Sequence, residues 1–321
     1  MVVSGGLGGW YRPAPMQTLV TGGAGFIGSH LVDALVERGD TVRVLDDLST
    51  GLASNINSAA ELVEGSIADE ECVARAVEGC EVVFHEGALG AVARSVADPR
   101  TSDRVNVHGT LTVLTVARDA GVRRLVFASS SSVYGGAEQV PTPETAPTRP
   151  RSPYAVSKLA GEWYTRVFAE LFEMETVALR YFNVFGPRQR PDSTYAAVIP
   201  LFAAALIGGE RPTVHGDGTQ SRDFTYVSDV VAANLLAASG PEKTSGQVFN
   251  VAPGEGASLL DLLSSLGRII GITPDPEFVD PRAGDIRTSC ADATKMRAAF
   301  GWAPEVDFET GLQQYINWMR N

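Results

Sequence analysis

The chain has 321 residues, of which 44% are hydrophobic and 20% charged, so it is long enough to bury a substantial core. Its 38 acidic residues outnumber 26 basic ones, and the formal charge of −12 argues against nucleic acid as a partner. No stretch approaches the run of about 20 apolar residues that a membrane span needs, so we expect no membrane partner. The three cysteines lack CxxC spacing, which fits free thiols in a reducing cytoplasm and no bound metal ion.

Short apolar strands alternate with helices through the first half of the chain. Residues 1–15 are glycine-rich and lack the features of a signal peptide, so we expect a mobile extension there. The expected strands are 17–21, 41–46, 61–64, 81–85, 124–129 and 176–181. The expected helices between them are 26–38, 70–78, 103–120 and 154–172. This alternation predicts an α/β fold of the Rossmann type, with a doubly wound parallel sheet covered by helices on both faces.

The pattern changes after about residue 184, where Gly, Pro and Arg become frequent between helices. The helices expected in this half are 195–207, 228–238, 258–270, 292–300 and 308–320. We expect a sheet domain at 16–183, which also receives segments near 222–250. A smaller C-terminal α/β domain at 184–321 would close over the open edge of that sheet.

A glycine-rich loop joins the first strand to the first helix. Gly22, Gly25 and Gly28 are spaced GxxGxxG, which permits a tight turn, a close backbone approach to a pyrophosphate and close helix packing. Amide groups at the helix start would face the anion. Asp46 ends the next strand, where its carboxylate would accept hydrogen bonds from the adenosine ribose and repel a 2′-phosphate. The loop therefore predicts bound NAD rather than NADP.

Three polar residue types point to hydride-transfer chemistry beside that loop. Tyr154 and Lys158 lie four positions apart on a predicted helix and share one face. Lys158 could hold the nicotinamide ribose, and its charge would lower the pKa of the Tyr154 phenol. Such a phenol could take a proton from a substrate hydroxyl while a hydride leaves for NAD. The serines at 129–132 follow a strand and would point into the same cleft.

These motifs resemble those of the extended short-chain dehydrogenase/reductase superfamily, and most of all those of its UDP-hexose 4-epimerases. The matching stretches are TGGAGFIGSH at 21–30, NVHGT at 106–110, SSSSVYG at 129–135, SPYAVSK at 152–158, RYFNVFGPRQ at 180–189, AAVIP at 196–200, GDGTQSRDFTYVSD at 216–229 and ADATK at 291–295. The resemblance implies a homodimer that epimerises a UDP-hexose with resident NAD. It also implies that 16–183 binds NAD and that 184–321 mostly binds the UDP-sugar.

The resemblance carries roles to individual residues. Tyr154 matches the base, Lys158 its partner, and Ser130 the serine that binds the sugar 4-hydroxyl. The residues expected around NAD are Gly22, Gly25, Phe26, Ile27, Gly28, Asp46, Asp47, Ser66, Ile67, Gly87, Asn106, Tyr154, Lys158 and Tyr181. The residues expected around the UDP-sugar are Ser130, Ser131, Asn183, Val198, Arg222, Arg282, Asp285 and Ser289. Of these, Arg222 and Arg282 match arginines on the diphosphate, which suits a bidentate guanidinium.

Two places in the sequence distinguish related reactions. Dehydratases that resemble this chain usually carry an Asp-Glu pair where it has Ser131 and Ser132, so elimination is poorly supported. The small Ser289 stands where epimerases restricted to non-acetylated sugars often have tyrosine. It indicates UDP-GlcNAc and UDP-GalNAc as substrates, with UDP-Glc and UDP-Gal as further ones. The alternatives are a UDP-glucuronate 4-epimerase or decarboxylase, another nucleotide-sugar dehydratase or oxidoreductase, and a non-catalytic NAD sensor.

Other positions depart from the pattern or leave two interpretations open. Ser66 replaces an Asp that usually lies near the adenine, which would weaken adenine recognition. Glu86 replaces an apolar or amide residue near the cofactor; it is either a rim residue with a local partner or a group that tunes the electrostatics around the nicotinamide. We expect His85 to pack at a strand end. The helices 103–120 and 154–172 would form the dimer, but their apolar faces equally suit packing on a sheet.

Overall fold

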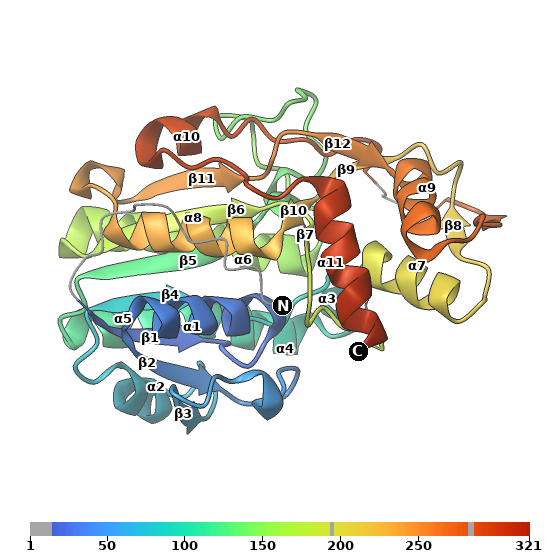
Figure 1. Cartoon of the computed structure of the whole chain (residues 1–321). Helices are drawn as coiled ribbons and strands as arrows, with labels where there is room; N and C mark the ends of the chain where they lie inside the picture. Colours follow the sequence, from blue (N-terminus) through green and yellow to red (C-terminus); the bar gives the residue numbers. More distant parts are fainter. Residues whose placement is uncertain (1–14, 193–195, 282–285) are drawn as a thin grey trace.

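The computed structural model describes residues 15–192, 196–281 and 286–321 (Figure 1), so Arg282, Asp285 and nearly all of the expected N-terminal extension lie outside the described residues. Seven strands build the central sheet: β1 (Gln17–Thr21), β2 (Thr41–Asp46), β3 (Glu61–Glu64), β4 (Val82–His85), β5 (Arg124–Ser130), β6 (Glu175–Tyr181) and β11 (Gln247–Val251). All neighbours pair in parallel, in the order β11-β6-β5-β4-β1-β2-β3. The predicted doubly wound α/β sheet is confirmed.

Helices cover both faces of this sheet (Figure 1). One face carries α1 (Phe26–Arg38) and α8 (Val227–Ser239), and the other carries α2 (Glu70–Val77), α5 (Gly109–Asp119) and α6 (Pro153–Phe172). Successive strand residues point to opposite faces, so each strand feeds two apolar clusters. In β1, for example, Val20 packs in the cluster with α1 and Leu19 in the cluster with α5.

The strand order reverses beside β1, which places β2 and β3 on one side and β4, β5, β6 and β11 on the other. Chain segments that leave β1 and β4 therefore diverge at their carboxyl ends. In a doubly wound sheet this divergence opens a crevice in which ligands bind. The carboxyl ends of these strands bring Gly22, Glu86, Ser130 and Asp46 to one edge of the sheet.

A smaller part of the molecule lies beyond that edge (Figure 1). Its helices are α7 (Val198–Ile207), α9 (Leu259–Ile270) and α11 (Phe308–Arg320), and its short strand pairs are β7 (Val184–Phe185) with β10 (Thr225–Tyr226), β8 (Thr213–His215) with β13 (Glu277–Val279), and β9 (Ser221–Asp223) with β12 (Gly256–Ser258). Phe185, Phe202, Leu262 and Tyr315 are among the buried side chains of its core. Since β11 and α8 also come from the second half of the sequence, that half contributes to both parts.

One predicted helix is interrupted. The stretch 103–120 consists of the end of α4 (Pro99–Asp103), a wider π-helical turn at Arg104–His108, and α5. Such turns inside helices often occur at functional sites. Other ends differ by a few residues: the described helix in 195–207 begins at Val198, and α10 (Thr294–Phe300) begins after residue 292. A short helix, α3 (Val92–Ala97), was not expected.

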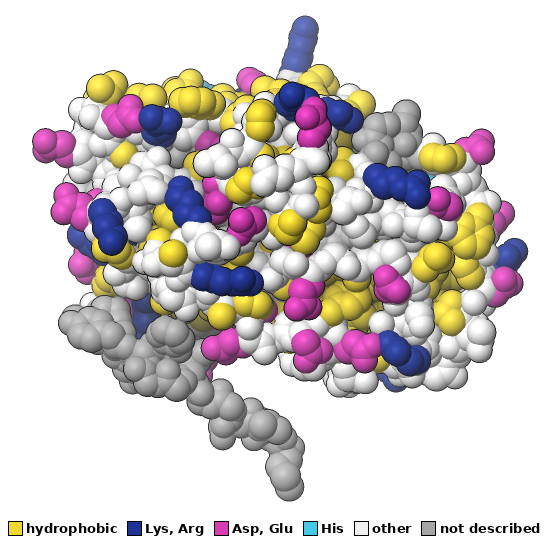
Figure 2. Space-filling model, turned by 90° about the horizontal axis from the view of Figure 1, so that it is seen from above, with side chains coloured by type: hydrophobic (Ala, Val, Ile, Leu, Met, Phe, Trp, Pro, Cys, Tyr) yellow, Lys and Arg dark blue, Asp and Glu magenta, His cyan; other side chains and the backbone are white. Residues whose placement is uncertain are grey.

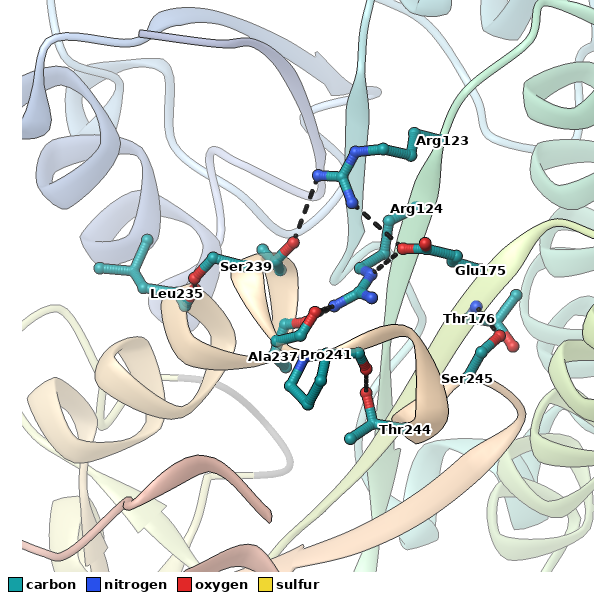
Figure 3. Close-up of polar contacts among 12 residues, drawn as sticks. Arg123, Arg124, Glu175, Thr176, Leu235, Ala237, Ser239, Pro241, Thr244 and Ser245 are labelled. Carbon is teal, nitrogen blue, oxygen red and sulfur yellow. Dashed lines mark hydrogen bonds and ion pairs between the residues drawn. The ribbon is translucent and has the colours of Figure 1, made fainter. Parts of the chain in front are cut away.

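At the amino edge of the sheet, a buried arginine is paired with a carboxylate and with backbone carbonyls (Figure 3). Arg124, the first residue of β5, is 1% exposed and its Nε donates to Oε2 of Glu175 at 2.5 Å. Its Nη1 donates to the carbonyls of Ala237 at 2.8 Å and Gly240 at 2.6 Å, at the end of α8. A cation at a helix C-terminus satisfies carbonyls that the helix leaves free. Arg124 thereby fixes α8 to the sheet.

The surface seen in Figure 2 carries acidic and basic side chains interspersed with apolar ones. Charges of both signs lie close together on this face, rather than in one block of either sign. Among the described residues, no helix combines the length and the hydropathy that crossing a membrane requires.

Candidate active site

The glycine-rich loop lies at the carboxyl end of β1 and packs too tightly for side chains. Gly22 has a φ of 69°, and a Cβ placed on it would lie 2.7 Å from Cα of Gly87. A Cβ on Gly28 would lie 2.2 Å from the carbonyl oxygen of Gly22. Gly25 begins α1 without a side-chain hydrogen bond, so the first amides of the helix can bind an anion. The loop fits the diphosphate of a dinucleotide.

A cleft of about 300 Å³, here called the cofactor cleft, extends from this loop along the strand ends. The expected NAD residues that line it are Gly22, Gly25, Phe26, Ile27, Gly28, Asp46, Asp47, Ile67, Gly87, Tyr154, Lys158 and Tyr181. Glu86, which the sequence placed near the cofactor without a fixed role, also lines it, and further lining residues that sequence reasoning did not assign to NAD are Leu45, Ser49, Thr50, Gly65, Ala88, Leu89, Gly90, Val105, Ala128 and Ser129. Of these, Leu45, Gly65, Glu86, Ala88 and Val105 directly neighbour a residue assigned to NAD, and that adjacency was the available signal.

Two expected NAD residues do not line the cleft. Ser66 uses its hydroxyl to accept a hydrogen bond from the amide of Ala68 at 3.2 Å. Asn106 is 2% exposed and binds both backbone groups of Leu89, at 2.8 and 3.1 Å, and the hydroxyl of Ser157 at 3.1 Å. The π-helical turn directs Asn106 to these partners. Asn106 therefore positions the wall of the cleft rather than forming part of its surface.

Asp46 is held in place by the loop that it faces. Its two carboxylate oxygens accept hydrogen bonds from the amides of Ala24 and Leu48, both at 2.9 Å. Burial raises the pKa of Asp46, and these backbone hydrogen bonds oppose the rise. The carboxylate is fixed at the end of β2, where the sequence predicts contact with the adenosine ribose.

His85 is a buried connector between strand ends, which agrees with its expected packing role. Its Nδ1 lies 2.8 Å from Oγ1 of Thr21, and its Nε2 lies 2.9 Å from Oγ1 of Thr110. Because Thr110 donates to the carbonyl of Asn106, it accepts from Nε2–H, and Thr21 then donates to Nδ1. Burial and the charge of Lys158 together lower the pKa of His85 to about 3, so the imidazole stays neutral.

Ser130, Tyr154 and Lys158 meet at the carboxyl end of β5. The hydroxyls of Ser130 and Tyr154 share a hydrogen bond. Lys158 is 4% exposed, and its Nζ donates to the carbonyl of Ala128 at 2.7 Å and lies 5.9 Å from the centre of the Tyr154 ring. The structure thus brings together the three residues that the sequence assigned to catalysis.

The serine run at 129–132 is divided by its partners. Ser129 donates to Oε1 of Glu162, which also forms a buried ion pair with Arg180 at 2.7 Å. Ser130 accepts from the amide of Ser132 at 3.2 Å and also bonds the Tyr154 phenol. This division supports Ser130, rather than Ser129, as the serine beside the reacting group.

Burial controls the titration of the catalytic pair. It raises the pKa of Tyr154; the hydrogen bond with Ser130 lowers that pKa and the negative charge of Glu86 raises it. Burial lowers the pKa of Lys158 to about 8, although Glu86 opposes this. The expected net lowering of the Tyr154 pKa by Lys158 is therefore wrong, because desolvation of the phenolate outweighs the other effects.

A larger cleft of about 860 Å³, here called the substrate cleft, lies next to the first, and segments 86–92 and 181–185 border both. Its lining includes the expected substrate residues Asn183, Val198 and Arg222. Arg222 donates to the carbonyls of Ser221 at 2.8 Å and Ile286 at 2.6 Å. Polar lining residues that sequence reasoning missed are Gln189, Glu210, Arg211, Thr213, His215 and Gln220. Gln189 stood within the quoted GPRQ motif, which was a signal for it.

Three other expected substrate residues in the described part of the chain, Ser130, Ser131 and Ser289, are not among the lining residues of either cleft. Ser131 follows Ser130 in a short 3₁₀ helix and is half-buried. Ser289 is also half-buried, and its amide donates to the carbonyl of Ser221 at 3.1 Å, one residue from Arg222. The role of Ser289 at the sugar stays a prediction. Arg282 and Asp285 lie outside the described residues, so their roles as substrate residues also stay predictions.

Comparison with known proteins gives consistent matches. The model of the NAD dependent epimerase/dehydratase family matches residues 18–252. A UDP-glucose 4-epimerase of Mycolicibacterium smegmatis is 42% identical over 95% of this chain and 99% of its own. The crystal structure of a Thermotoga maritima UDP-glucose 4-epimerase with UDP-glucose is 40% identical, with a TM-score of 0.91 over 95% of this chain and 99% of its own. A UDP-N-acetylglucosamine 4-epimerase of Methanobrevibacter ruminantium M1 in complex with UDP-N-acetylmuramic acid is 36% identical, with a TM-score of 0.91 over 95% and 98%.

Proposed function

The chain belongs to the NAD-dependent epimerase/dehydratase family, and from this premise we propose that it inverts C4 of a UDP-hexose through a transient 4-keto sugar. The predictions of the family and of NAD as cofactor are confirmed. The observation that carries the proposal is the meeting of Ser130, Tyr154 and Lys158 beside a glycine loop that fits a dinucleotide.

The residues divide the reaction between them. NAD, when bound, supplies the acceptor and donor of the hydride at C4. Tyr154 takes the proton from the C4 hydroxyl and returns it after the sugar presents its opposite face, while Ser130 orients that hydroxyl. Lys158 holds the cofactor ribose and provides positive charge beside the phenol. Arg222 anchors the diphosphate, so that only the hexose turns.

Product analysis with a panel of UDP-sugars tests this function. An epimerase yields a product of unchanged mass with inverted C4, because the hydride that leaves also returns. Incubation with UDP-glucose, UDP-N-acetylglucosamine and UDP-glucuronate, followed by mass spectrometry and stereochemical analysis, distinguishes the related reactions. A lighter product would indicate a decarboxylase or dehydratase, and accumulating NADH would indicate an oxidoreductase. Either result would contradict the proposal.

We propose further that the substrates include the N-acetylated sugars UDP-GlcNAc and UDP-GalNAc. The volume of the substrate cleft and the small, half-buried Ser289 beside Ser221 support this proposal. Ser289→Tyr should lower kcat/KM for acetylated sugars by about tenfold or more relative to UDP-glucose, since an overfilled pocket excludes the larger group. Ser289→Ala is the matched control and should keep the ratio. Equal losses of kcat/KM on both sugar types in the tyrosine variant would refute the role of Ser289 in admitting acetylated sugars.

We also propose a homodimer formed through α6, in a reducing cytoplasm that suits three free cysteines. Leu114 of α5 is buried against the sheet, whereas Trp163 and Leu171 of α6 are 58% and 70% exposed. The sheet therefore uses one side of this helix pair and leaves an apolar face of α6 open. Light scattering should report a dimer that Leu171→Glu dissociates and the control Ile272→Glu, at an exposed site elsewhere, does not. A monomeric wild-type chain would exclude the dimer.

A further inference from the structure

Glu86 is a half-buried acid that the proposed reaction does not use. It follows β4 and lines the cofactor cleft together with Tyr154 and Lys158. The hydroxyl of Tyr181 donates to Oε1 of Glu86 at 2.7 Å, and Nδ2 of Asn234 donates to the oxygen of Tyr181 at 2.7 Å. This chain of hydrogen bonds runs from α8 through β6 to the end of β4. It fixes the carboxylate at the wall of the cleft.

The charges that face Glu86 leave its own charge poorly compensated. Lys158 and Tyr154 approach from α6 and Tyr181 from β6, while the neighbouring His85 on β4 is neutral. The ammonium of Lys158 donates to the carbonyl of Ala128. Burial raises the pKa of Glu86 to about 7, although Tyr181 and Lys158 lower it. A second cation in the cleft would stabilise the carboxylate.

We propose that Glu86 makes the protein bind oxidised cofactor in preference to reduced cofactor. The nicotinamide ring is a cation in NAD⁺ and neutral in NADH, so an anionic wall beside Tyr154 and Lys158 attracts only the oxidised form. The benefit to catalysis rests on the proposed function. An epimerase returns the hydride to the sugar in every turnover and must begin the next turnover with NAD⁺.

The charge balance of the cofactor couples this preference to pH. Reduction adds a hydride, which carries two electrons and one proton, and removes the positive charge of the ring. The ring cation lowers the pKa of Glu86, and its loss on reduction restores the higher value, so NAD⁺ binding releases protons that NADH binding does not. By linkage, the preference for NAD⁺ should increase as the pH rises through about 7, where Glu86 ionises. Lys158 loses its proton near 8 and adds to the increase at higher pH.

Binding measurements on the full-length chain freed of cofactor test the proposal. Calorimetry gives Kd for NAD⁺ and for NADH below and above pH 7 in the wild type and in Glu86→Gln, whose amide oxygen still accepts from Tyr181. We expect the ratio of the NADH Kd to the NAD⁺ Kd to fall about tenfold in the variant, which equals one pKa unit of lost charge interaction. Its dependence on pH below neutrality should disappear. Glu37→Gln removes the same charge from an exposed position on α1 and should leave the ratio unchanged.

The outcomes separate an electrostatic role from a structural one. If Glu86→Gln weakens both affinities equally, or neither, Glu86 does not discriminate between the two forms and the proposal is overturned. Glu86→Asp keeps the charge and should retain the wild-type preference, even if the glutamine variant binds neither form; loss of the preference in the aspartate variant would overturn the proposal too. Because no sugar is present, failure to epimerise any UDP-sugar leaves this result intact, and an active epimerase with an unchanged ratio refutes only the role of Glu86.

Discussion

Charged side chains are paired at the amino edge of the central sheet and poorly compensated at its carboxyl edge. At the amino edge, the guanidinium of Arg124 contacts the Glu175 carboxylate and two carbonyls at the end of α8 (Figure 3). At the carboxyl edge, Glu86 is half-buried and Lys158 is buried, and their pKa values are moved to about 7 and about 8. Matched charge stabilises a fold, whereas charge left poorly compensated is ready to interact with a ligand. The difference identifies the carboxyl edge as the functional one without reference to any motif.

Removing the phenol at the carboxyl edge should have the largest effect. Tyr154→Phe deletes the group that accepts and returns the C4 proton, so turnover should fall by about 10²–10⁴-fold. The glycine loop is untouched, and NAD should still bind, which calorimetric titration with NAD⁺ can check. Tyr164→Phe, on the same helix but packed in the apolar cluster, is the matched control and should keep its turnover. Near-normal turnover of Tyr154→Phe would exclude Tyr154 as the base.

Breaking the amino edge should reduce stability instead of catalysis. Arg124→Met leaves two carbonyls without their donor and Glu175 with Arg123 as its remaining partner, and the free energy of unfolding should fall by about 3 kcal/mol. This estimate lies at the low end for a broken buried pair because the Glu175 side chain is 22% exposed. Urea unfolding measures the loss. The exposed pair of Arg211 with Asp275 provides the control, since Arg211→Met should change stability by less than about 1 kcal/mol.

Turnover of the folded fraction distinguishes the two edges. Arg124→Met should retain near wild-type kcat under conditions where it is folded, since Arg124 lies at the opposite end of the strands from Tyr154. A large loss of kcat in a fully folded Arg124 variant would contradict the separation of the edges into structural and functional.

The sequence predicts most of the carboxyl edge because its signals are local. The spacing of Gly22, Gly25 and Gly28 and the i, i+4 pair Tyr154 and Lys158 each lie within a single turn or helix. Parallel strands then bring such local signals to one edge, so the fold and the catalytic set follow together.

Contacts between distant segments were beyond sequence reasoning. The π-helical turn at 104–108 contains Asn106, whose hydrogen-bond partners lie 17 and 51 residues away in the sequence. The apolar pattern of this stretch is that of a continuous helix and does not predict the turn. The same holds for the bond from Tyr181 to Glu86, which joins the ends of two strands. The pKa of Tyr154 was misjudged for a related reason: spacing indicates a neighbouring charge, but burial follows only from the packed structure.

The alkaline limb of the pH profile of kcat/KM should show the smallest of the expected effects, and its position tests the comparison of the two edges. Burial lowers the pKa of Lys158 from its ordinary 10.5 to about 8, so its ammonium is lost as the pH rises through 8, and kcat/KM should fall there. The anion of Glu86 raises the pKa of Lys158, so Glu86→Gln should move this limb to lower pH, by about one unit or less. Kinetics across the alkaline range would show the shift. A limb that stays in place while the rate falls at every pH would mean that Glu86 only supports the fold, as Arg124 does at the opposite edge.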